Sequence, residues 1–223
     1  MDNLTLVIPA KYEKESLPSV LTELKKYNLL THIVLEENDH ETINSISKFD
    51  CKLIIQQNKG YGDALIKGIR SVKTDFFCIF NADGSFKPDE LKYMMELSKI
   101  HNYDLVFGSR YEKNSSSEDD TIVTFIGNKF FSFLGKIFFS LPINDILYTF
   151  VLGKTKKTND LNLVSKDFCF CVELPIKAKK NGLKLISSPA NERRRIAGKK
   201  KVNAFRDGLK ILIAMVKLKF KLL

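Results

Sequence analysis

The chain has 223 residues, a length that fits one large domain or a domain with an appended tail. Apolar residues make up 44% of it, which provides for a sizeable core and excludes a globally disordered protein. The net charge of +10 favours an anionic partner such as a phosphorylated substrate, anionic lipid or nucleic acid, and the basic surplus is concentrated after residue 150.

Several classes of segment are not expected from the sequence. Residues 1–10 lack a basic region followed by a long apolar stretch, so no secretory signal is predicted. No run of about 18 uninterrupted apolar residues occurs, so no membrane-spanning helix is predicted. Cys169 and Cys171 are too close for a relaxed disulfide, and together with Cys51 and Cys78 they lack the spacing of a zinc site. We therefore expect four reduced thiols and a cytoplasmic protein.

The first 110 residues alternate strand-like and helix-like segments. Apolar and β-branched runs predict strands at 4–10, 32–35, 51–56, 75–80 and 103–107. Helical periodicity predicts helices at 15–27, 42–48, 64–72 and 88–99. This order predicts an α/β fold, in which a Rossmann-like, mostly parallel sheet carries helices on both faces.

Polar side chains follow each of the five predicted strands. They lie at 11–13, 36–39, 58–62, 81–83 and 109–110. Because the carboxyl ends of parallel strands meet at one edge of a sheet, where ligands bind, we expect these segments to gather around one site.

The strongest local signal is Asp83, which follows a buried strand two residues after Asn81. A carboxylate at a strand end can hold a hard divalent cation that also binds phosphate oxygens. Such a cation neutralises charge as a diphosphate leaves. An ordinary Asp-Gly turn after a strand is the structural alternative.

The second half of the chain contains two apolar segments with regularly spaced polar residues. Residues 121–141 predict a Phe-rich helix with one narrow polar stripe, and residues 205–222 predict a second amphipathic helix whose last residues also fit a strand. Both have lysines beside a broad apolar face, which is typical of helices at an anionic membrane surface. Burial against the domain or in a dimer is the alternative.

The motifs PAKYE, NKGYGDAL, NADGSFKP and FGSRY, with acidic residues after the second strand, resemble glycosyltransferase family 2 and its GT-A fold. The resemblance is strongest to the dolichyl-phosphate mannose synthase and polyprenyl-phosphate glycosyltransferase branch. It covers 4–115 well and continues more weakly through Asp145, 170–173 and 195–201. It implies an inverting, metal-dependent hexosyltransferase of cell-envelope polysaccharide biosynthesis. Mg²⁺ or Mn²⁺ would serve as cofactor, a UDP- or GDP-sugar as donor, and a lipid phosphate or glycan as acceptor.

The resemblance also implies roles for individual residues. Asp83 and Asn81 would hold the metal, although Asn81 stands where the family has Asp. Asp83, Asp145 and Arg110 would be the catalytic residues. Donor contacts would come from Pro9, Ala10, Glu13, Glu36, Glu37, Lys59, Gly60, Asn81, Ala82, Asp83, Arg110, Arg195 and Lys201.

The resemblance divides the chain into a GT-A domain at 1–202 and an amphipathic tail at 203–223. Within the domain, 1–115 would bind the nucleotide-sugar and 116–202 the acceptor. A lipid-phosphate acceptor needs no general base, whereas a hydroxyl acceptor needs a carboxylate, with Asp145 or the Asp89/Glu90 pair as candidates.

The sequence leaves other interpretations open. Asn81 motivates a non-catalytic nucleotide-sugar-binding or membrane-associated scaffold protein as the alternative. Nucleic-acid binding is not expected, since the basic run 193–201 lacks interleaved aromatic residues. The location that fits best is peripheral, on the cytoplasmic face of the membrane, and a homo-oligomer is compatible with the sequence.

Overall fold

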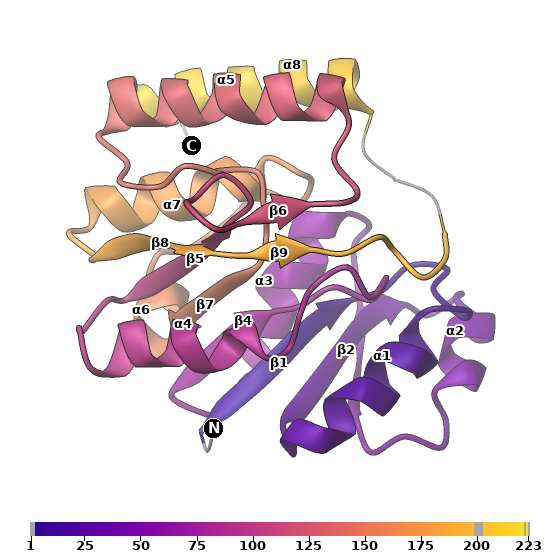
Figure 1. Ribbon diagram of the computed structural model, residues 1–223. Coiled ribbons are helices and arrows are strands. Elements are labelled where there is room, and N and C mark those ends of the chain that lie inside the picture. Colours follow the sequence, from indigo (N-terminus) through magenta and orange to yellow (C-terminus); the bar gives the residue numbers. More distant parts are fainter. Residues whose placement is uncertain (1–2, 199–202, 221, 223) are drawn as a thin grey trace.

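The computed structural model describes residues 3–198, 203–220 and 222, and its centre is a seven-stranded sheet (Figure 1). Across the sheet the strands follow the order β3-β2-β1-β4-β7-β5-β8. Their bounds are β1 (Leu4–Pro9), β2 (Leu30–Glu36), β3 (Lys52–Gln56), β4 (Phe76–Ile79), β5 (Leu105–Ser109), β7 (Val151–Lys154) and β8 (Leu185–Pro189). Neighbouring strands are parallel except at β7, which runs antiparallel to β4 and β5. The predicted α/β fold with a mostly parallel sheet is confirmed.

Helices cover both faces of the sheet, as the sequence predicts. Their bounds are α1 (Leu17–Leu24), α2 (His40–Ser45), α3 (Tyr61–Ser71), α4 (Glu90–Lys99), α6 (Thr155–Asn159) and α7 (Phe170–Lys180), and a 3₁₀ turn spans Lys25–Tyr27. Successive residues of a strand point to opposite faces. Thus Val7 of β1 joins the core beneath α3 and α7, while Leu6 and Ile8 join the core beneath α1 and α4. Burial on both faces explains the uninterrupted apolar run of this strand.

β7 and β8 are the parts of the sheet that the sequence analysis did not assign. β7 is short and contains Gly153, which lowers its strand signal. Only glycine fits there, because a Cβ would lie 2.4 Å from Cδ2 of Leu105 and 2.7 Å from Cε1 of Phe77. The insertion of β7 separates β4 from β5, which chain order alone would have placed side by side.

Two long helices form an outer layer above the sheet (Figure 1). They are α5 (Ile122–Phe139) and α8 (Ala204–Lys219), which contact each other and α7. The N-terminus of α5 is capped by the Thr121 side chain and that of α8 by Asn203. The helices predicted at 121–141 and 205–222 are therefore confirmed, and the strand alternative for the last residues is wrong through Lys219. Two short strands, β6 (Ser116–Ser117) and β9 (Asn191–Glu192), pair below this layer.

The expectation that no helix spans a membrane stays a prediction for α5. The helix has 18 residues with a mean hydropathy of 1.4, so by length and composition it could cross a membrane. The expectation of no membrane-spanning helix rested on the lack of an uninterrupted apolar run. The apolar sequence is interrupted by four polar residues, which are too few to remove the apolar character of the helix: Asn128, Lys129, Ser132 and Lys136.

The four cysteines are free thiols, in agreement with expectation.

Candidate active site

The carboxyl edge of the sheet brings the loop after β1 against the loop after β2. In β1, Pro9 is the last residue, and the amide of Ala10 donates to the carbonyl of Val34 at 2.8 Å. The Tyr12 amide then donates to the Asp39 carboxylate at 2.7 Å, and the Glu13 amide donates to Oγ1 of Thr42 at 2.9 Å. These contacts confirm that the polar segments 11–13 and 36–39 meet at one edge.

A polar hollow of about 520 Å³ lies at the ends of β2 and β3. It is lined by Glu36, Glu37, Asn38, His40, Gln56, Gln57, Asn58 and Lys59. Three of these residues, Glu36, Glu37 and Lys59, were predicted as donor contacts. Asn38 and Asn58 belong to the segments 36–39 and 58–62 that were expected at this edge, whereas His40, Gln56 and Gln57 were missed. Lys11 bridges this hollow to the neighbouring loop, since its Nζ lies 2.8 Å from Oε1 of Glu36.

The loop after β4 holds Asp83 with one oxygen turned inward and one turned toward Arg195. Oδ1 of Asp83 accepts from the Ser85 amide at 3.0 Å, while Oδ2 lies 3.6 Å from Nη1 of Arg195. Gly84 permits this turn with a φ of 82°, a conformation that side chains rarely adopt. Ala82 is buried beneath the loop. Asp83 therefore presents a single carboxylate oxygen outward.

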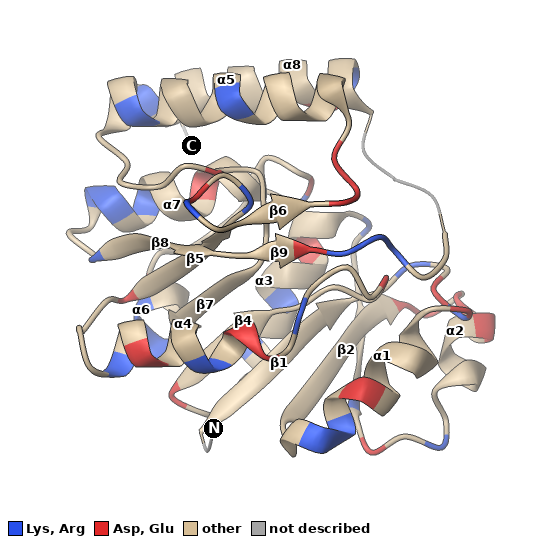
Figure 2. Cartoon of the chain, viewed as in Figure 1, with Lys and Arg blue, Asp and Glu red and all other residues tan. Residues whose placement is uncertain are grey.

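The basic segment 193–198 lies directly on the Asp83 loop. The amide of Arg193 donates to the carbonyl of Ser85, and the amide of Ile196 donates to the carbonyl of Asp83, both at 2.8 Å. In Figure 2 this segment, blue at its arginines, extends from β9 toward the carboxyl ends of β1 and β2. These backbone contacts fix the Arg195 side chain beside Asp83. Lys201, also predicted to bind the donor, lies outside the described residues.

Arg195 is surrounded by carboxylates. Its Nη2 lies 2.7 Å from Oδ2 of Asp119, a residue that the sequence analysis missed. The hydrogen bond to Asp119 raises the pKa of Arg195 most, and the charges of Asp83, Asp119 and Glu13 raise it further against the opposing effect of burial. Glu13 faces the same segment, since a Cβ on Gly198 would lie 3.6 Å from its Oε2. Three predicted residues, Glu13, Asp83 and Arg195, are thus brought together.

The predicted metal ligands form an incomplete set by themselves. The Asn81 side chain is used within its own loop, where it donates to Oγ of Ser85 and accepts from the Phe86 amide. Among residues 3–198, 203–220 and 222, no group of three or more His, Cys, Asp or Glu side chains is placed to hold a metal. One outward carboxylate nevertheless fits Mg²⁺ or a similar ion, which binds through one or two carboxylates and takes its other ligands from phosphates and water.

Arg110 and Asp145 lie in a buried cluster with Glu192. Nε and Nη2 of Arg110 donate to the two carboxylate oxygens of Asp145 at 2.7 and 2.9 Å, and Nη1 donates to Glu192 at 3.2 Å. The side chains of Arg110, Asp145 and Glu192 are 8%, 0% and 9% exposed. Burial lowers the pKa of Arg110, but hydrogen bonds and charge from Asp145 and the charge of Glu192 outweigh it and raise that pKa overall. Burial raises the pKa of Glu192 despite the Arg110 charge.

This geometry gives Arg110 and Asp145 a structural role. A guanidinium with two carboxylate partners and the Tyr148 ring 4.5 Å from its Cζ is already engaged by groups within the chain. The pair ties the end of β5 to the loop before β7 and, through Glu192, to β9. Their contact with a substrate stays a prediction, and Glu192 could not be found without knowing that it folds back onto Arg110.

The glycines at the start of α3 are required by close packing. A Cβ on Gly60 would lie 2.1 Å from the carbonyl oxygen of Lys166, and one on Gly62 would lie 2.2 Å from that of Ser165. The amide of Asp63 also donates to the Lys166 carbonyl at 3.1 Å. Gly60 was predicted as a donor contact, whereas the structure places another loop of the chain against it.

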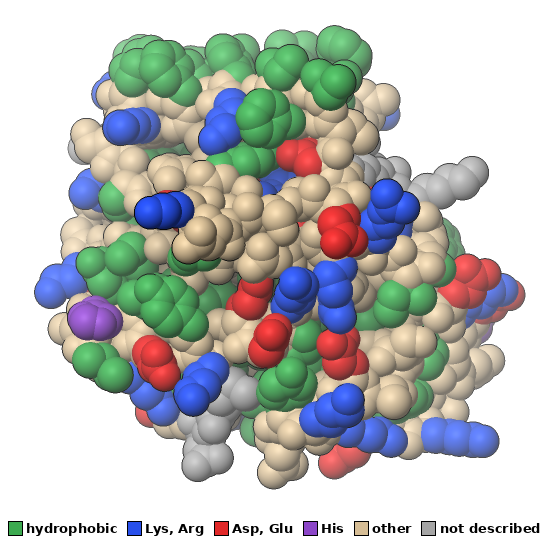
Figure 3. Space-filling model, in the orientation of Figure 1, with side chains coloured by type: hydrophobic (Ala, Val, Ile, Leu, Met, Phe, Trp, Pro, Cys, Tyr) green, Lys and Arg blue, Asp and Glu red, His purple; other side chains and the backbone are tan. Residues whose placement is uncertain are grey.

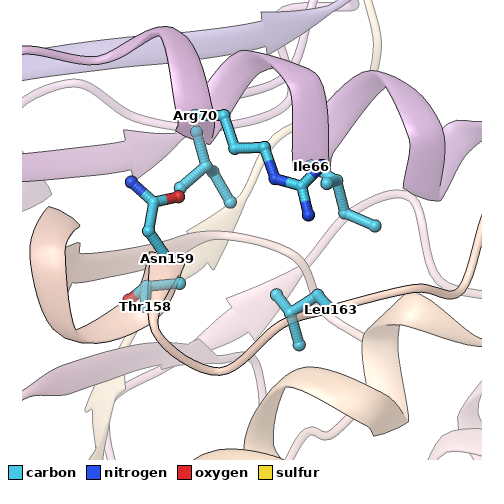
Figure 4. A pocket seen from close by; sticks show the side chains of 6 residues that line it. Ile66, Arg70, Thr158, Asn159 and Leu163 are labelled. Carbon is cyan, nitrogen blue, oxygen red and sulfur yellow. The ribbon is translucent and has the colours of Figure 1, made fainter.

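A second, much smaller cavity lies away from this edge (Figure 4). It is a space of about 10 Å³ between α3 and α6, lined by Ile66, Ile69, Arg70, Thr158, Asn159 and Leu163. That volume suits about one water molecule. The large polar hollow at the carboxyl edge is therefore the ligand-sized space of the two.

A mostly parallel sheet with a polar hollow and an acid-and-arginine cluster at its carboxyl edge is typical of a nucleotide-binding α/β protein. The sequence model of glycosyl transferase family 2 matches residues 5–161, which is most of the chain. The chain therefore belongs to glycosyl transferase family 2.

Relatives and solved structures agree with this assignment. An uncharacterised glycosyltransferase of Mycobacterium tuberculosis (strain ATCC 25618 / H37Rv) is 27% identical over 214 residues, which cover 95% of each chain. The UDP-N-acetylglucosamine–dolichyl-phosphate N-acetylglucosaminyltransferase of Methanococcus voltae is 24% identical over 209 residues, covering 82% of this chain and 83% of the relative.

Glucosyl-3-phosphoglycerate synthase of M. tuberculosis, solved with Mn²⁺, UDP and glucosyl-3-phosphoglycerate, has the same fold with a TM-score of 0.77 at 11% identity, over 96% of this chain and 79% of its own. Mannosyl-3-phosphoglycerate synthase of Rubrobacter xylanophilus has a TM-score of 0.71 at 14% identity, over 98% of this chain and 72% of its own.

Proposed function

We propose that this glycosyltransferase moves a sugar from a nucleotide-diphosphate sugar to a lipid-phosphate acceptor, with inversion and with the aid of Mg²⁺ or Mn²⁺. The observation that carries the proposal is the cluster of Glu13, Asp83 and Arg195 beside the polar hollow at the carboxyl edge. In support, one relative is named for a UDP-sugar and a dolichyl-phosphate, and one protein with the same fold was solved with Mn²⁺ and UDP.

The hollow is the proposed place of the nucleoside. Its volume of about 520 Å³ lies within the range of about 300–1,000 Å³ that is usual for small-molecule sites. The Glu36 and Glu37 carboxylates can accept hydrogen bonds from the N–H of a uracil or guanine ring or from ribose hydroxyls. Lys11 and Lys59 lie at the border of the hollow and can attract the phosphates.

The Asp83 loop is the proposed place of the diphosphate. Asp83 would hold the divalent ion, which supplies charge neutralisation to the leaving diphosphate. Without a ligand, Arg195 contacts the carboxylates of Asp83 and Asp119. The oxygens of a bound diphosphate can accept hydrogen bonds from the same guanidinium in their place. Backbone hydrogen bonds from residues 193 and 196 keep this arginine beside the loop while its side chain exchanges partners. A fixed cation at that point stabilises the charge that develops on the leaving group.

The acceptor is proposed to be anionic before it reacts. A lipid phosphate needs no general base, and two of the carboxylates weighed for that role, Asp145 and Glu90, are engaged elsewhere. Asp145 is bound to Arg110, and Oε1 of Glu90 accepts from the Asn191 amide at 2.8 Å. Burial raises the pKa of Glu90, although its hydrogen bonds to Asn191 oppose the rise.

The test is sugar transfer by purified protein to a short polyprenyl phosphate, with UDP- and GDP-sugars and Mn²⁺ or Mg²⁺. We expect Asp83→Asn to lower turnover about 100-fold or more, because oriented charge stabilisation typically contributes that much. Asp50→Asn is the matched control, since Asp50 is exposed and precedes β3 at the opposite end of the strand.

The alternative is a protein that binds nucleotide-sugar without turnover. The inward-turned Asn81 side chain favours it, because it leaves one acidic metal ligand in the loop. Calorimetric binding of a nucleotide-sugar with no product on any acceptor would select this alternative. Unchanged turnover in Asp83→Asn would refute the assignment of the diphosphate site.

A further inference from the structure

The outer surface of the α5–α8 layer is covered with apolar side chains. In Figure 3 they spread over the top of the molecule as a nearly continuous hydrophobic region. The exposed apolar residues of this layer are Ile122, Val123, Phe125, Ile126, Phe130, Phe133, Ile137 and Phe138 on α5, with Phe205, Leu209, Ile213 and Val216 on α8. Large contiguous apolar surfaces of this kind mark a site of interaction with a partner or a membrane.

The opposite side of α5 is fastened to the globular body. Asn128 donates from Nδ2 to the Tyr111 hydroxyl at 3.0 Å, and Oγ of Ser132 accepts from the Ile146 amide at 3.1 Å. Phe131 is buried in the core with Ile211 of α8. Asn128 and Ser132 of the polar stripe are therefore held by contacts within the chain.

This attachment argues against a membrane-spanning α5. Crossing a bilayer would require the helix to leave the body and to place Asn128, Lys129, Ser132 and Lys136 in hydrocarbon, where polar and charged groups are costly. Docked as it is, the helix can still bury its outer face to a shallow depth while lying flat.

The charge of the layer identifies the partner. The two helices contain six Lys and Arg residues and one Asp. The cations Lys129, Lys136, Arg206, Lys210, Lys217 and Lys219 are all exposed. A second copy of this chain on the same surface would bring like charges together, whereas anionic headgroups would neutralise them. Long lysine stems can follow the apolar surface and still place their charge at headgroup level.

The layer is also oriented toward the candidate active site. Both α5 and α8 begin at the right-hand end in Figure 1, on the side to which the arrowheads of β1 and β2 point. Just before α5 lies Asp119, which binds Arg195 beside Asp83. A flat surface against the layer therefore lies next to the carboxyl edge of the sheet.

We propose that the outer face of α5 and α8 lies in the interface of an anionic phospholipid bilayer, with both helices parallel to the membrane plane and neither spanning it. The docking rests on the surface alone. The consequence that a lipid-phosphate acceptor reaches the site from this bilayer rests on the proposed function.

Flotation of the full chain with vesicles tests the docking without any turnover. We expect co-flotation with vesicles of phosphatidylcholine and phosphatidylglycerol, and at least about 10-fold weaker binding to phosphatidylcholine alone. Lys136→Glu with Lys217→Glu should weaken binding similarly, whereas Lys26→Glu with Lys92→Glu, at exposed positions outside the layer, should not. Equal loss in both pairs, or no binding to anionic vesicles, overturns the proposal.

Depth measurements separate a flat helix from a spanning one. The chain contains no Trp, so Ile126→Trp and Ile137→Trp each create a single reporter on an exposed apolar position of α5. For a flat helix, brominated lipids should quench both from the same shallow depth. A spanning helix would separate them by about 16 Å, at 1.5 Å per residue, and that result overturns the proposal. Tyr93→Trp on α4 is the control that should stay unquenched.

Size-exclusion chromatography distinguishes membrane docking from self-association through this face. If the layer is a dimer interface, the chain elutes as a dimer without lipid, Phe133→Gln makes it monomeric, and anionic vesicles do not bind; this set of results contradicts the proposal. Thermal melting of each variant, compared with wild type, confirms that the surface changes leave the fold intact.

Discussion

At the scale of single residues, the buried cluster of Arg110, Asp145 and Glu192 is the clearest case of charges that depend on one another. Two carboxylates and one guanidinium share a region where each is at most 9% exposed. Burying a charge is costly unless it is paired and hydrogen-bonded. The Asp145 carboxylate meets this condition with both oxygens, so the cluster stabilises the connection between β5 and β9 only while all partners remain.

Removing Asp145 should therefore destabilise the whole domain. We expect Asp145→Ala to lower the free energy of unfolding by about 3–5 kcal/mol, because Arg110 is left buried with incomplete compensation. Urea unfolding measures the change, and Asp160→Ala is the control at an exposed position, where the effect should stay within about 0.5 kcal/mol. A stable Asp145→Ala protein that has lost turnover would instead assign this carboxylate a direct part in catalysis.

The same residues show what could be predicted from the sequence. The position of Arg110 at a strand end was predictable, because every strand end of a parallel sheet lies at one edge. Its partners were not, since Asp145 is 35 residues away and Glu192 is 82 residues away along the chain. Glu13, Asp83 and Arg195 do meet as their placement indicated, while Asp119, which binds Arg195, lies in a Ser-rich loop without a recognisable motif.

At the scale of elements, glycine positions report which segments approach each other closely. Gly62 lies in the first turn of α3, where an added Cβ would come within 2.2 and 2.6 Å of the carbonyl oxygens of Ser165 and Asp167. Gly127 lies within the helix α5, and no described atom is within 4 Å of a Cβ there. Both glycines thus lie in helices, but another loop packs tightly against Gly62, whereas the space beside Gly127 is open.

Alanine at these two positions should have effects of opposite sign. Gly62→Ala should destabilise by about 1–3 kcal/mol, because backbone atoms of the 165–167 loop must move. Gly127→Ala should stabilise by about 0.5–1 kcal/mol, since alanine loses less backbone entropy in a helix. Chemical denaturation of both variants measures the pair. Equal stabilisation by both would mean that the 165–167 loop does not pack against α3.

Elements also differ in how far the sequence specifies them. Strands β1 to β5 and the helices between them were predictable, because each is an apolar or periodic segment. β7 was not, since Gly153 weakens its strand signal and its place between β4 and β5 arises from tertiary pairing. The α5 and α8 helices were predictable, but their mutual packing into one layer was not. The proposed division into halves at 1–115 and 116–202 stays a prediction.

At the scale of the whole molecule, the proposed donor site spans two regions that are far apart in sequence. The hollow belongs to the first 60 residues, whereas Arg195 reaches Asp83 from the segment after β9. A ligand that contacts both regions joins the first and last parts of the sheet layer. Its binding free energy therefore adds to the stability of the entire fold, by mass action.

Addition of UDP with Mn²⁺ should consequently raise the melting temperature. At about 100 times the dissociation constant, the stabilisation is about 2.7 kcal/mol, which for a chain of this size corresponds to a shift of about 5–10 °C. Mn²⁺ alone should shift it little, because Asp83 offers one outward carboxylate and the diphosphate has to supply further ligands. Differential scanning fluorimetry with and without chelator separates the two contributions.

Arg195→Gln should reduce the shift in melting temperature that UDP with Mn²⁺ produces, because it removes the cation next to Asp83. Arg194→Gln, which changes the exposed neighbouring residue, should retain that shift. An equal shift for UDP with and without metal would mean that the nucleotide binds through the hollow while Asp83 holds no ion. An equal shift in Arg195→Gln and in wild type would mean that this arginine remains on Asp119 and never reaches the diphosphate.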